Sequence, residues 1–244
     1  MIEFITPDWP APANVRAYTT LRNGGASIAP FNTFNLATHV GDDEKNVLAN
    51  RQLLTNTLNL PLEPLWLNQT HGTVAIDAAI AKDNNADASF TNKTGQPCVV
   101  MSADCLPVLI CNRKGTHVAA IHAGWRGLAH GIIENTLRAL NLPCSEIMAW
   151  LGPAIGPTVF EVGSEVREVF LQNNANTEQA FHPSSRENHW LGNLYLLDTL
   201  RLQMQGVSAI YGGNHCTYTE EKYFFSYRRD NSKTGRIATL IWMT

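Results

Sequence analysis

Residues 98–127, CVVMSADCLPVLICNRKGTHVAAIHAGWRG, contain three short segments that are continuously apolar or rich in β-branched residues. They run from Cys98 to Ser102, from Leu106 to Cys111 and from His117 to Ile121, and each has the length of a strand. Residues 112–115 (NRKG) form a good hairpin turn between the last two segments. The stretch therefore predicts a group of neighbouring strands that includes a hairpin.

Helices and strands alternate on both sides of this stretch. The apolar pattern predicts further strands at 15–20, 65–67, 73–78, 147–151 and 237–242, and helices at 42–58, 128–140, 161–172 and 193–205. Because a hairpin interrupts the alternation, we expect a mixed α and β fold rather than a purely parallel, doubly wound sheet. The sequence has no repeat, low-complexity tract or linker, so we expect a single domain over residues 1–244.

Composition excludes several classes of protein. The 244 residues are 44% hydrophobic and 16% charged, which is typical of a globular chain that builds its core without disulfides. A net charge of -3 and a pI near 6.2 favour neither nucleic acid nor an anionic membrane as partner. The first residues lack a signal-peptide pattern, and the apolar runs are too short to span a bilayer, so we expect the cytoplasm. The five cysteines are scattered and form no C-x-x-C pair.

Three segments place a metal-competent residue where a predicted strand ends. They are residues 69–72 (QTHG), 103–107 (ADCLP) and 121–127 (IHAGWRG), and they carry His71, Cys105 and His122. Zinc favours thiolate and imidazole ligands, and three protein ligands leave a position open for catalysis. The intervals, from 71 to 105 and from 105 to 122, match no local zinc signature. Spacing alone therefore leaves the metal site a minority interpretation.

Motifs along nearly the whole chain carry a family resemblance. In order, they are residues 21–25 (LRNGG), 40–43 (VGDD), 50–51 (NR), 68–72 (NQTHG), 103–107 (ADCLP), 122–127 (HAGWRG), 151–157 (LGPAIGP), 161–163 (EVG), 216–217 (CT) and 224–230 (FFSYRRD). The chain resembles the laccase-domain family, long labelled multicopper polyphenol oxidases and later reassigned as purine nucleoside phosphorylases. The resemblance implies an α+β fold, a four-layer α/β/β/α sandwich, with a zinc ion on His71, Cys105 and His122. Copper remains possible.

The resemblance also implies a chemistry. Family members phosphorolyse adenosine, inosine and S-methyl-5'-thioadenosine to a base and a (methylthio)ribose 1-phosphate, and they deaminate adenosine. A zinc-activated water provides a physical route to deamination. Phosphorolysis needs a phosphate site, and a guanidinium fork matches phosphate geometry. The arginines within the motifs are Arg22, Arg126, Arg228 and Arg229.

Two further groups of residues keep alternative roles. Asp104, beside Cys105, either transfers a proton or supports a metal-bound histidine and the local turn. Aromatic residues in the motifs could stack on a purine, although burial in the core is the commoner reason for such residues. These aromatics are Trp125, Phe224, Phe225 and Tyr227. We expect an enzyme that binds purine nucleosides and phosphate as a monomer or weak homo-oligomer.

Other functions stay open. A copper-dependent polyphenol oxidase would fit the older family name, but multicopper oxidases use paired His-x-His segments and a His-Cys-His run, which this chain lacks. A metal-free hydrolase or deamidase could use Cys105 as nucleophile and His122 as base. The family fold is shared with a bacterial toxin deamidase, which supports that alternative. Editing of cell-wall precursors has been attached to bacterial relatives, and no sequence feature tests it.

Overall fold

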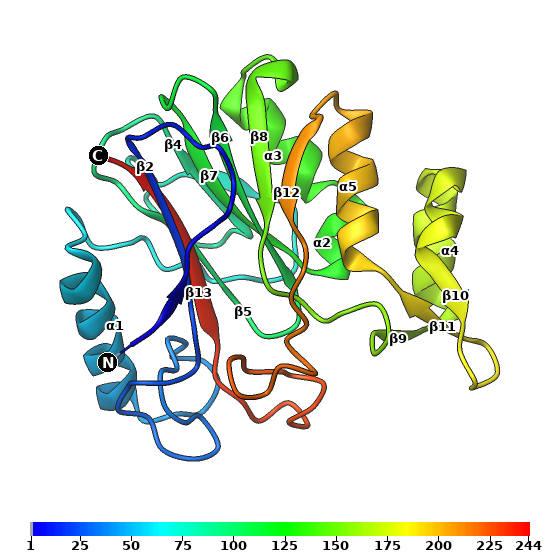
Figure 1. Ribbon diagram of the computed structural model, residues 1–244, viewed down its shortest axis with the longest axis horizontal. Coiled ribbons are helices and arrows are strands. Elements are labelled where there is room, and N and C mark those ends of the chain that lie inside the picture. Colours follow the sequence, from blue (N-terminus) through cyan, green and yellow to red (C-terminus); the bar gives the residue numbers. More distant parts are fainter. Residues whose placement is uncertain (1) are drawn as a thin grey trace.

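A computed structural model describes residues 2–244 and contains two sheets that face one another (Figure 1). The first sheet has the strand order β1-β2-β13-β5, and the second has the order β12-β8-β6-β7-β4-β3. The strands of the first sheet are β1 (Phe4–Ile5), β2 (Val15–Thr20), β5 (Cys98–Ser102) and β13 (Ile237–Met243). Those of the second are β3 (Ala75–Asp77), β4 (Ala88–Thr91), β6 (Leu106–Asn112), β7 (Val118–Ala123), β8 (Ile147–Leu151) and β12 (Ala209–Gly212).

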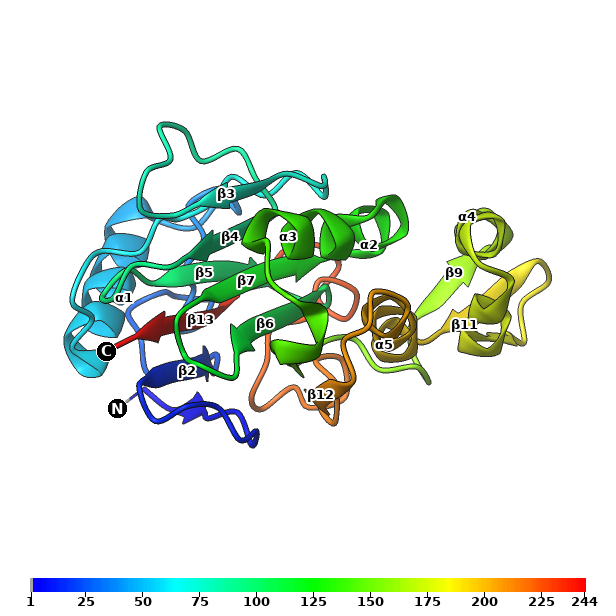
Figure 2. The ribbon, with the colours of Figure 1, turned by 90° about the horizontal axis from the view of Figure 1, so that it is seen from above.

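Helices cover the outer face of each sheet (Figure 2). Helix α1 packs on the first sheet, and helices α2, α3 and α5 pack on the second. Their bounds are α1 (Glu44–Leu58), α2 (Trp125–His130), α3 (Ile132–Leu140) and α5 (Leu194–Met204), and short 3-10 helices span Cys144–Glu146 and Ala175–Ala180. The expected α+β fold with four layers, α/β/β/α, is confirmed.

The central strands are continuously apolar because both of their faces are buried. In β6, Val108 and Ile110 pack against the helices, while Leu109 and Cys111 pack between the two sheets. Strand β13 divides its side chains in the same way between the inter-sheet core and the α1 layer. Because side chains alternate across a strand, one strand contributes residues both to the core between the sheets and to the core beneath the helices.

A smaller sheet lies to one side of the sandwich. Strands β9 (Glu161–Gly163), β10 (Phe181–Pro183) and β11 (His189–Gly192) pair antiparallel in the order β10-β11-β9, beside α4 (Ser164–Asn173). Figure 1 shows this unit beyond α5. No helix within residues 2–244 is both long enough and apolar enough to cross a membrane.

Most predicted elements are confirmed, and the errors have local causes. The helix predicted at 128–140 is two helices, because Gly131 has φ of 100° and breaks the hydrogen-bond ladder. The helix predicted at 161–172 begins later, because its first three residues pair with β11. The strand predicted at 65–67 is not regular structure, and the strand predicted at 73–78 is only Ala75–Asp77.

Candidate metal centre

His71, Cys105 and His122 come together at one end of the second sheet. Strands β6 and β7 pair antiparallel with Leu106 opposite Ala123 and Pro107 opposite His122, so Cys105, just before β6, lies beside His122. His71 reaches them from the loop before β3. One nitrogen or sulfur atom from each of the three residues lies within 4.8 Å of the others. Segments far apart in the sequence thus present two imidazoles and one thiol to a common point.

The backbone around His71 is held in an unusual conformation. His71 has φ of 60°, a region that a residue with a side chain seldom adopts. The Asp87 carboxylate accepts the backbone N–H groups of Thr70, His71 and Gly72 at 3.1, 2.9 and 2.7 Å. Three successive amides converging on one buried carboxylate fix this turn and hence the position of the His71 ring.

The same carboxylate orients His122. Oδ1 of Asp87 lies 2.8 Å from Nδ1 of His122. Because a carboxylate only accepts, Nδ1 carries the proton and Nε2 is left free for a metal. Burial alone would raise the pKa of Asp87, but the hydrogen bonds and charge of His122 and the backbone donors lower it below its usual value. Asp87 is therefore ionised and supports two of the three candidate ligands.

The Cys105 thiol is poised to ionise. Burial alone would raise the pKa of Cys105, but the charge of His122 and hydrogen bonds from His122 and His71 outweigh it and lower the pKa. The His122 pKa is raised, since Cys105 and Asp87 outweigh the opposing effect of burial. Sγ of Cys105 lies 3.6 Å from Nε2 of His71. A metal ion binds the thiolate form of cysteine, and the surroundings of Cys105 already favour that form.

The space around the three side chains fits a bound ion. A Cβ atom on Gly124 would lie 2.6 Å from Cδ2 of His71 and 3.1 Å from Sγ of Cys105, so only glycine permits this approach. A thiolate and two imidazoles are the donors that zinc prefers and that copper also accepts. Among residues 2–244, this is the one group of three His, Cys, Asp or Glu side chains close enough to share an ion. The donor set thus supports a mononuclear metal site.

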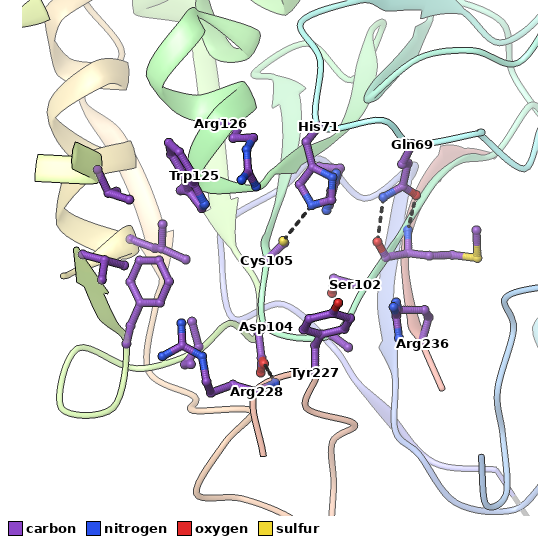
Figure 3. Close-up of a pocket in the computed structure, with 18 of the residues that line it drawn as sticks. Gln69, His71, Ser102, Asp104, Cys105, Trp125, Arg126, Tyr227, Arg228 and Arg236 are labelled. Atoms are coloured by element: carbon purple, nitrogen blue, oxygen red, sulfur yellow. Dashed lines mark hydrogen bonds between the residues drawn. The ribbon is translucent and has the colours of Figure 1, made fainter. Parts of the chain in front are cut away.

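The three candidate ligands line a cavity of about 570 Å³. Figure 3 shows Trp125, Arg126 and Arg228 on one side of it, and Gln69 and Arg236 on the other. The wall near β9 and α4 contributes Phe160, Glu161, Val162, Glu165 and Val166. A cavity of this volume accommodates a ligand of nucleoside size.

The four predicted arginines do not share one location. Arg126 and Arg228 are exposed and line the cavity. Arg22 and Arg229 are not among the lining residues, and both donate to main-chain carbonyl groups of the chain's last loops. The guanidinium of Arg229 also pairs with Asp230 at 2.8 Å. The structure thus brings two of the four to the site, and it gives the other two a role in holding loops.

Asp104 is buried and organises a loop that borders the cavity of the candidate metal site. Its carboxylate accepts hydrogen bonds from the Thr217 and Ser226 hydroxyls at 2.6 and 3.0 Å and from the Arg228 backbone N–H at 2.7 Å. No hydrogen bond joins Asp104 to His71 or His122 in residues 2–244; Asp87 has that role for His122. The geometry favours the turn-supporting alternative for Asp104 over proton transfer.

The aromatic candidates also separate. Trp125 and Tyr227 line the cavity, and Tyr227 is 49% exposed, so its ring is available for stacking. Phe224 and Phe225 are buried in a small core with Leu21, Ala103 and Ile237. Two aromatics are thus placed to contact a ligand, and two stabilise the fold.

Sequence reasoning missed several residues of this site. Asp87 has partners in two distant segments, which no local motif reveals. Gln69 lies inside a recognised motif, and its side-chain amide pairs with the backbone of Met101 at 2.7 and 2.8 Å, which holds the loop that leads to His71. His39, which belongs to none of the motifs, lines the cavity together with Ser102 and Arg236. Only Gln69 lies within a motif; the other missed residues lie outside the motifs, so no local signal identified them.

The fold and the site define a class of protein in which a two-sheet sandwich carries one candidate His-Cys-His metal centre at the base of a cavity. The family model described as multi-copper polyphenol oxidoreductase laccase matches residues 16–244. The chain therefore belongs to this laccase-domain family.

Similar bacterial proteins are named for a different activity. A protein of Pseudomonas aeruginosa named purine nucleoside phosphorylase is 48% identical over 100% of this chain and 99% of its own length. A protein of Escherichia coli with that name is 47% identical over the full length of both. The crystal structure of a Neisseria meningitidis protein matches with a TM-score of 0.94 and 48% identity over 98% of both chains.

Proposed function

We propose that this chain is a zinc-dependent purine nucleoside phosphorylase acting on adenosine, inosine and S-methyl-5'-thioadenosine, with additional adenosine deaminase activity. One observation carries the proposal: the His71, Cys105 and His122 cluster opens into a cavity that also holds guanidinium groups and stacking aromatics. These are the groups that a nucleoside and a phosphate require together. The names of relatives that are 47 to 48% identical support the same activity.

Each group of residues in the cavity has a separate role in this proposal. Trp125 and Tyr227 offer ring faces to a purine, and the arginines of the cavity offer donors to phosphate. His71, Cys105 and His122 would hold zinc, which supplies Lewis-acid chemistry at that point when bound. Asp87 keeps His122 in the tautomer that leaves Nε2 free. The apolar wall of Phe160, Val162 and Val166 excludes water from one side of the substrate.

The decisive experiment replaces the thiol ligand. Purified protein is incubated with adenosine, with and without phosphate, and adenine, ribose 1-phosphate and inosine are quantified by chromatography. Cys105→Ala should abolish all three products and should reduce zinc content, measured by inductively coupled plasma mass spectrometry, from about one ion per chain to none. Cys144→Ala is the matched control, because Cys144 is half-buried and away from the cavity. Full turnover by Cys105→Ala would contradict the proposal.

A metal-free hydrolase or deamidase is a second candidate, and one observation favours it. Cys105, His122 and Asp87 follow one another as thiol, imidazole and carboxylate, the order that activates a cysteine nucleophile. Under this alternative, protein stripped of metal would release ammonia from an amide substrate, and Asp87→Asn would abolish that activity. Metal content decides between the two candidates.

A further inference from the structure

Arg236 carries a guanidinium that faces the cavity without an acidic partner. Its Nη1 donates to the carbonyl groups of Thr234 and Gly235 at 2.9 and 3.0 Å, and within residues 2–244 no hydrogen bond is made by Nε or Nη2. No carboxylate of the described chain forms an ion pair with it. Burial lowers the pKa of Arg236, against the opposing charges of Cys105, Tyr227 and Asp104. Nε and Nη2 of Arg236 are not shielded from the cavity, so the guanidinium keeps two nitrogens that can donate to an anion there.

Ser102 supplies a second polar group without a partner at the same place. Ser102 lines the cavity and is only 2% exposed, and its hydroxyl has no hydrogen-bond partner among the described residues. Strand pairing sets Ser102 opposite Ile237, the residue that follows Arg236. Ser102 and Arg236 therefore lie at the ends of two paired strands, and both line the cavity. Buried polar groups without partners are uncommon, and an ion or water bound at the site is one explanation for such a group.

His39 adds a third donor to this side of the cavity. Burial lowers the pKa of His39, and the positive charges of Arg236 and Arg51 lower it further, which favours the neutral imidazole. Arg51 is anchored elsewhere, since it stacks over the Trp66 ring and donates to the carbonyl of Leu36. His39 lines the cavity, so its imidazole can donate one hydrogen bond to a ligand there.

The opposite side of the cavity is less suited to an anion. Glu161 and Glu165 line that wall, and the Glu161 carboxylate accepts a hydrogen bond from the Ser184 hydroxyl. Arg228 is exposed, and its Nη1 already donates to the carbonyl of Glu161 at 2.9 Å. Figure 3 shows Arg228 and Arg236 on different sides of Tyr227. Arg228 thus already has a main-chain partner, whereas Nε and Nη2 of Arg236 remain free to bind an oxyanion.

We propose that Arg236, Ser102 and His39 form the subsite that binds inorganic phosphate, a role that rests on the proposed phosphorolysis. The two free guanidinium donors, the hydroxyl and the imidazole together match the several oxygens of a phosphate ion. In the reaction, a phosphate oxygen bonds to C1' of the ribose as the C1'–N9 bond breaks. The electron pair of that bond passes to the purine, and the proton of hydrogen phosphate ends on the departing base.

Steady-state kinetics of the zinc-loaded full chain test the subsite. Arg236→Gln should raise the KM for phosphate by about 30-fold while the KM for the nucleoside changes by less than about 3-fold, because charge-assisted hydrogen bonds to phosphate alone are lost. Ser102→Ala and His39→Gln should each raise the phosphate KM by about 3- to 10-fold. Arg16→Gln, which removes an exposed arginine on β2, is the charge-matched control. An unchanged phosphate KM in Arg236→Gln would overturn the subsite.

Calorimetric titration with inorganic phosphate separates this proposal from the proposed function. If the wild-type chain binds phosphate, and Arg236→Gln binds it at least about 10-fold more weakly, the subsite stands even if no nucleoside is turned over. If the wild-type chain does not bind phosphate, or if Arg228→Gln rather than Arg236→Gln abolishes binding, the subsite is wrong. Circular dichroism checks folding. Should Arg236→Gln misfold, Arg236→Lys, which keeps the charge and loses the fork, should still weaken binding.

Discussion

Oδ1 of Asp87 lies 2.8 Å from Nδ1 of His122, and both side chains are buried, with 0% and 5% of their surface exposed. The other oxygen of Asp87 accepts the backbone N–H groups of Thr70 and Gly72, on either side of His71. One carboxylate therefore links the candidate ligand on β7, His122, to the candidate ligand on the loop, His71. We therefore expect that loss of Asp87 would disturb the positions of both candidate ligands.

Asp87→Asn should weaken zinc binding by about 10- to 100-fold, as is usual when the partner of a ligating histidine is lost. The amide oxygen of an asparagine can still accept the hydrogen bond from His122. Its NH2 group would then face the backbone N–H groups of Thr70 and Gly72, which donate to Oδ2 in the wild-type chain. Competition with a chromogenic chelator measures the affinity. Asp83→Asn, on an exposed turn, is the control, and equal affinities for the two variants would contradict the positioning role.

Gly124→Ala should abolish metal binding while the chain still folds. The new methyl group would lie 2.6 Å from Cδ2 of His71, a separation that requires the imidazole to move. Gly72→Ala is the comparison, since its Cβ meets nothing closer than Oγ1 of Thr70 at 3.3 Å. Zinc content and thermal unfolding of both variants are the measurements. Stoichiometric zinc in Gly124→Ala would show that the site tolerates the displacement.

Asp104→Asn should destabilise the fold and leave the metal in place. Three donors converge on the two oxygens of Asp104, and an amide nitrogen can accept none of them. We expect a loss of about 1 to 3 kcal/mol in the free energy of unfolding, the usual result for a buried donor without a partner. Urea titration and zinc analysis test this. Zinc loss without loss of stability would instead assign Asp104 to the metal site.

Asp198→Asn should change how stability depends on pH. Asp198 is buried in α5, its oxygens have no hydrogen-bond partner, and burial together with the charge of Glu134 raises its pKa to about 8. An unfolded aspartate titrates near pH 4, so between about pH 4 and pH 8 the folded state holds a proton that the unfolded state has released. Stability of the wild-type chain should therefore fall as the pH rises through this window.

The variant removes that titration, so its unfolding free energy should decline less between pH 5 and pH 8, by on the order of a few kcal/mol. Urea unfolding at several pH values gives both curves. Parallel curves for the wild-type chain and Asp198→Asn would show that Asp198 is ionised in the folded state as it is in the unfolded one.

Local pattern was enough to predict much of the fold. Strands Cys98–Ser102 and Ile147–Leu151 agree with the structure at both ends, because short, continuously apolar runs have few alternatives in a mixed fold. Strands β9 to β11 were missed. Their side chains are only partly buried and show no clear alternation. These strands form only because distant segments of the chain pair with one another.

His71, Cys105 and His122 could be nominated from the sequence because donor chemistry and motif position are local properties. Arg22 and Arg229 could not be separated from Arg126 and Arg228 in this way. Whether a guanidinium meets a carbonyl group or an open cavity depends on loops that pack from opposite ends of the chain.

The sequence by itself determined the apolar segments that become strands, the family, and the residue types able to bind a metal. Only the tertiary structure decided that Asp87 orients His122 and that Arg236 faces the cavity without an acidic partner. The physical reason is the separation along the sequence over which each interaction acts. Hydrophobic pattern acts over a few neighbouring residues, whereas a hydrogen bond between residues 35 positions apart exists only after two strands have paired and set the side chains side by side.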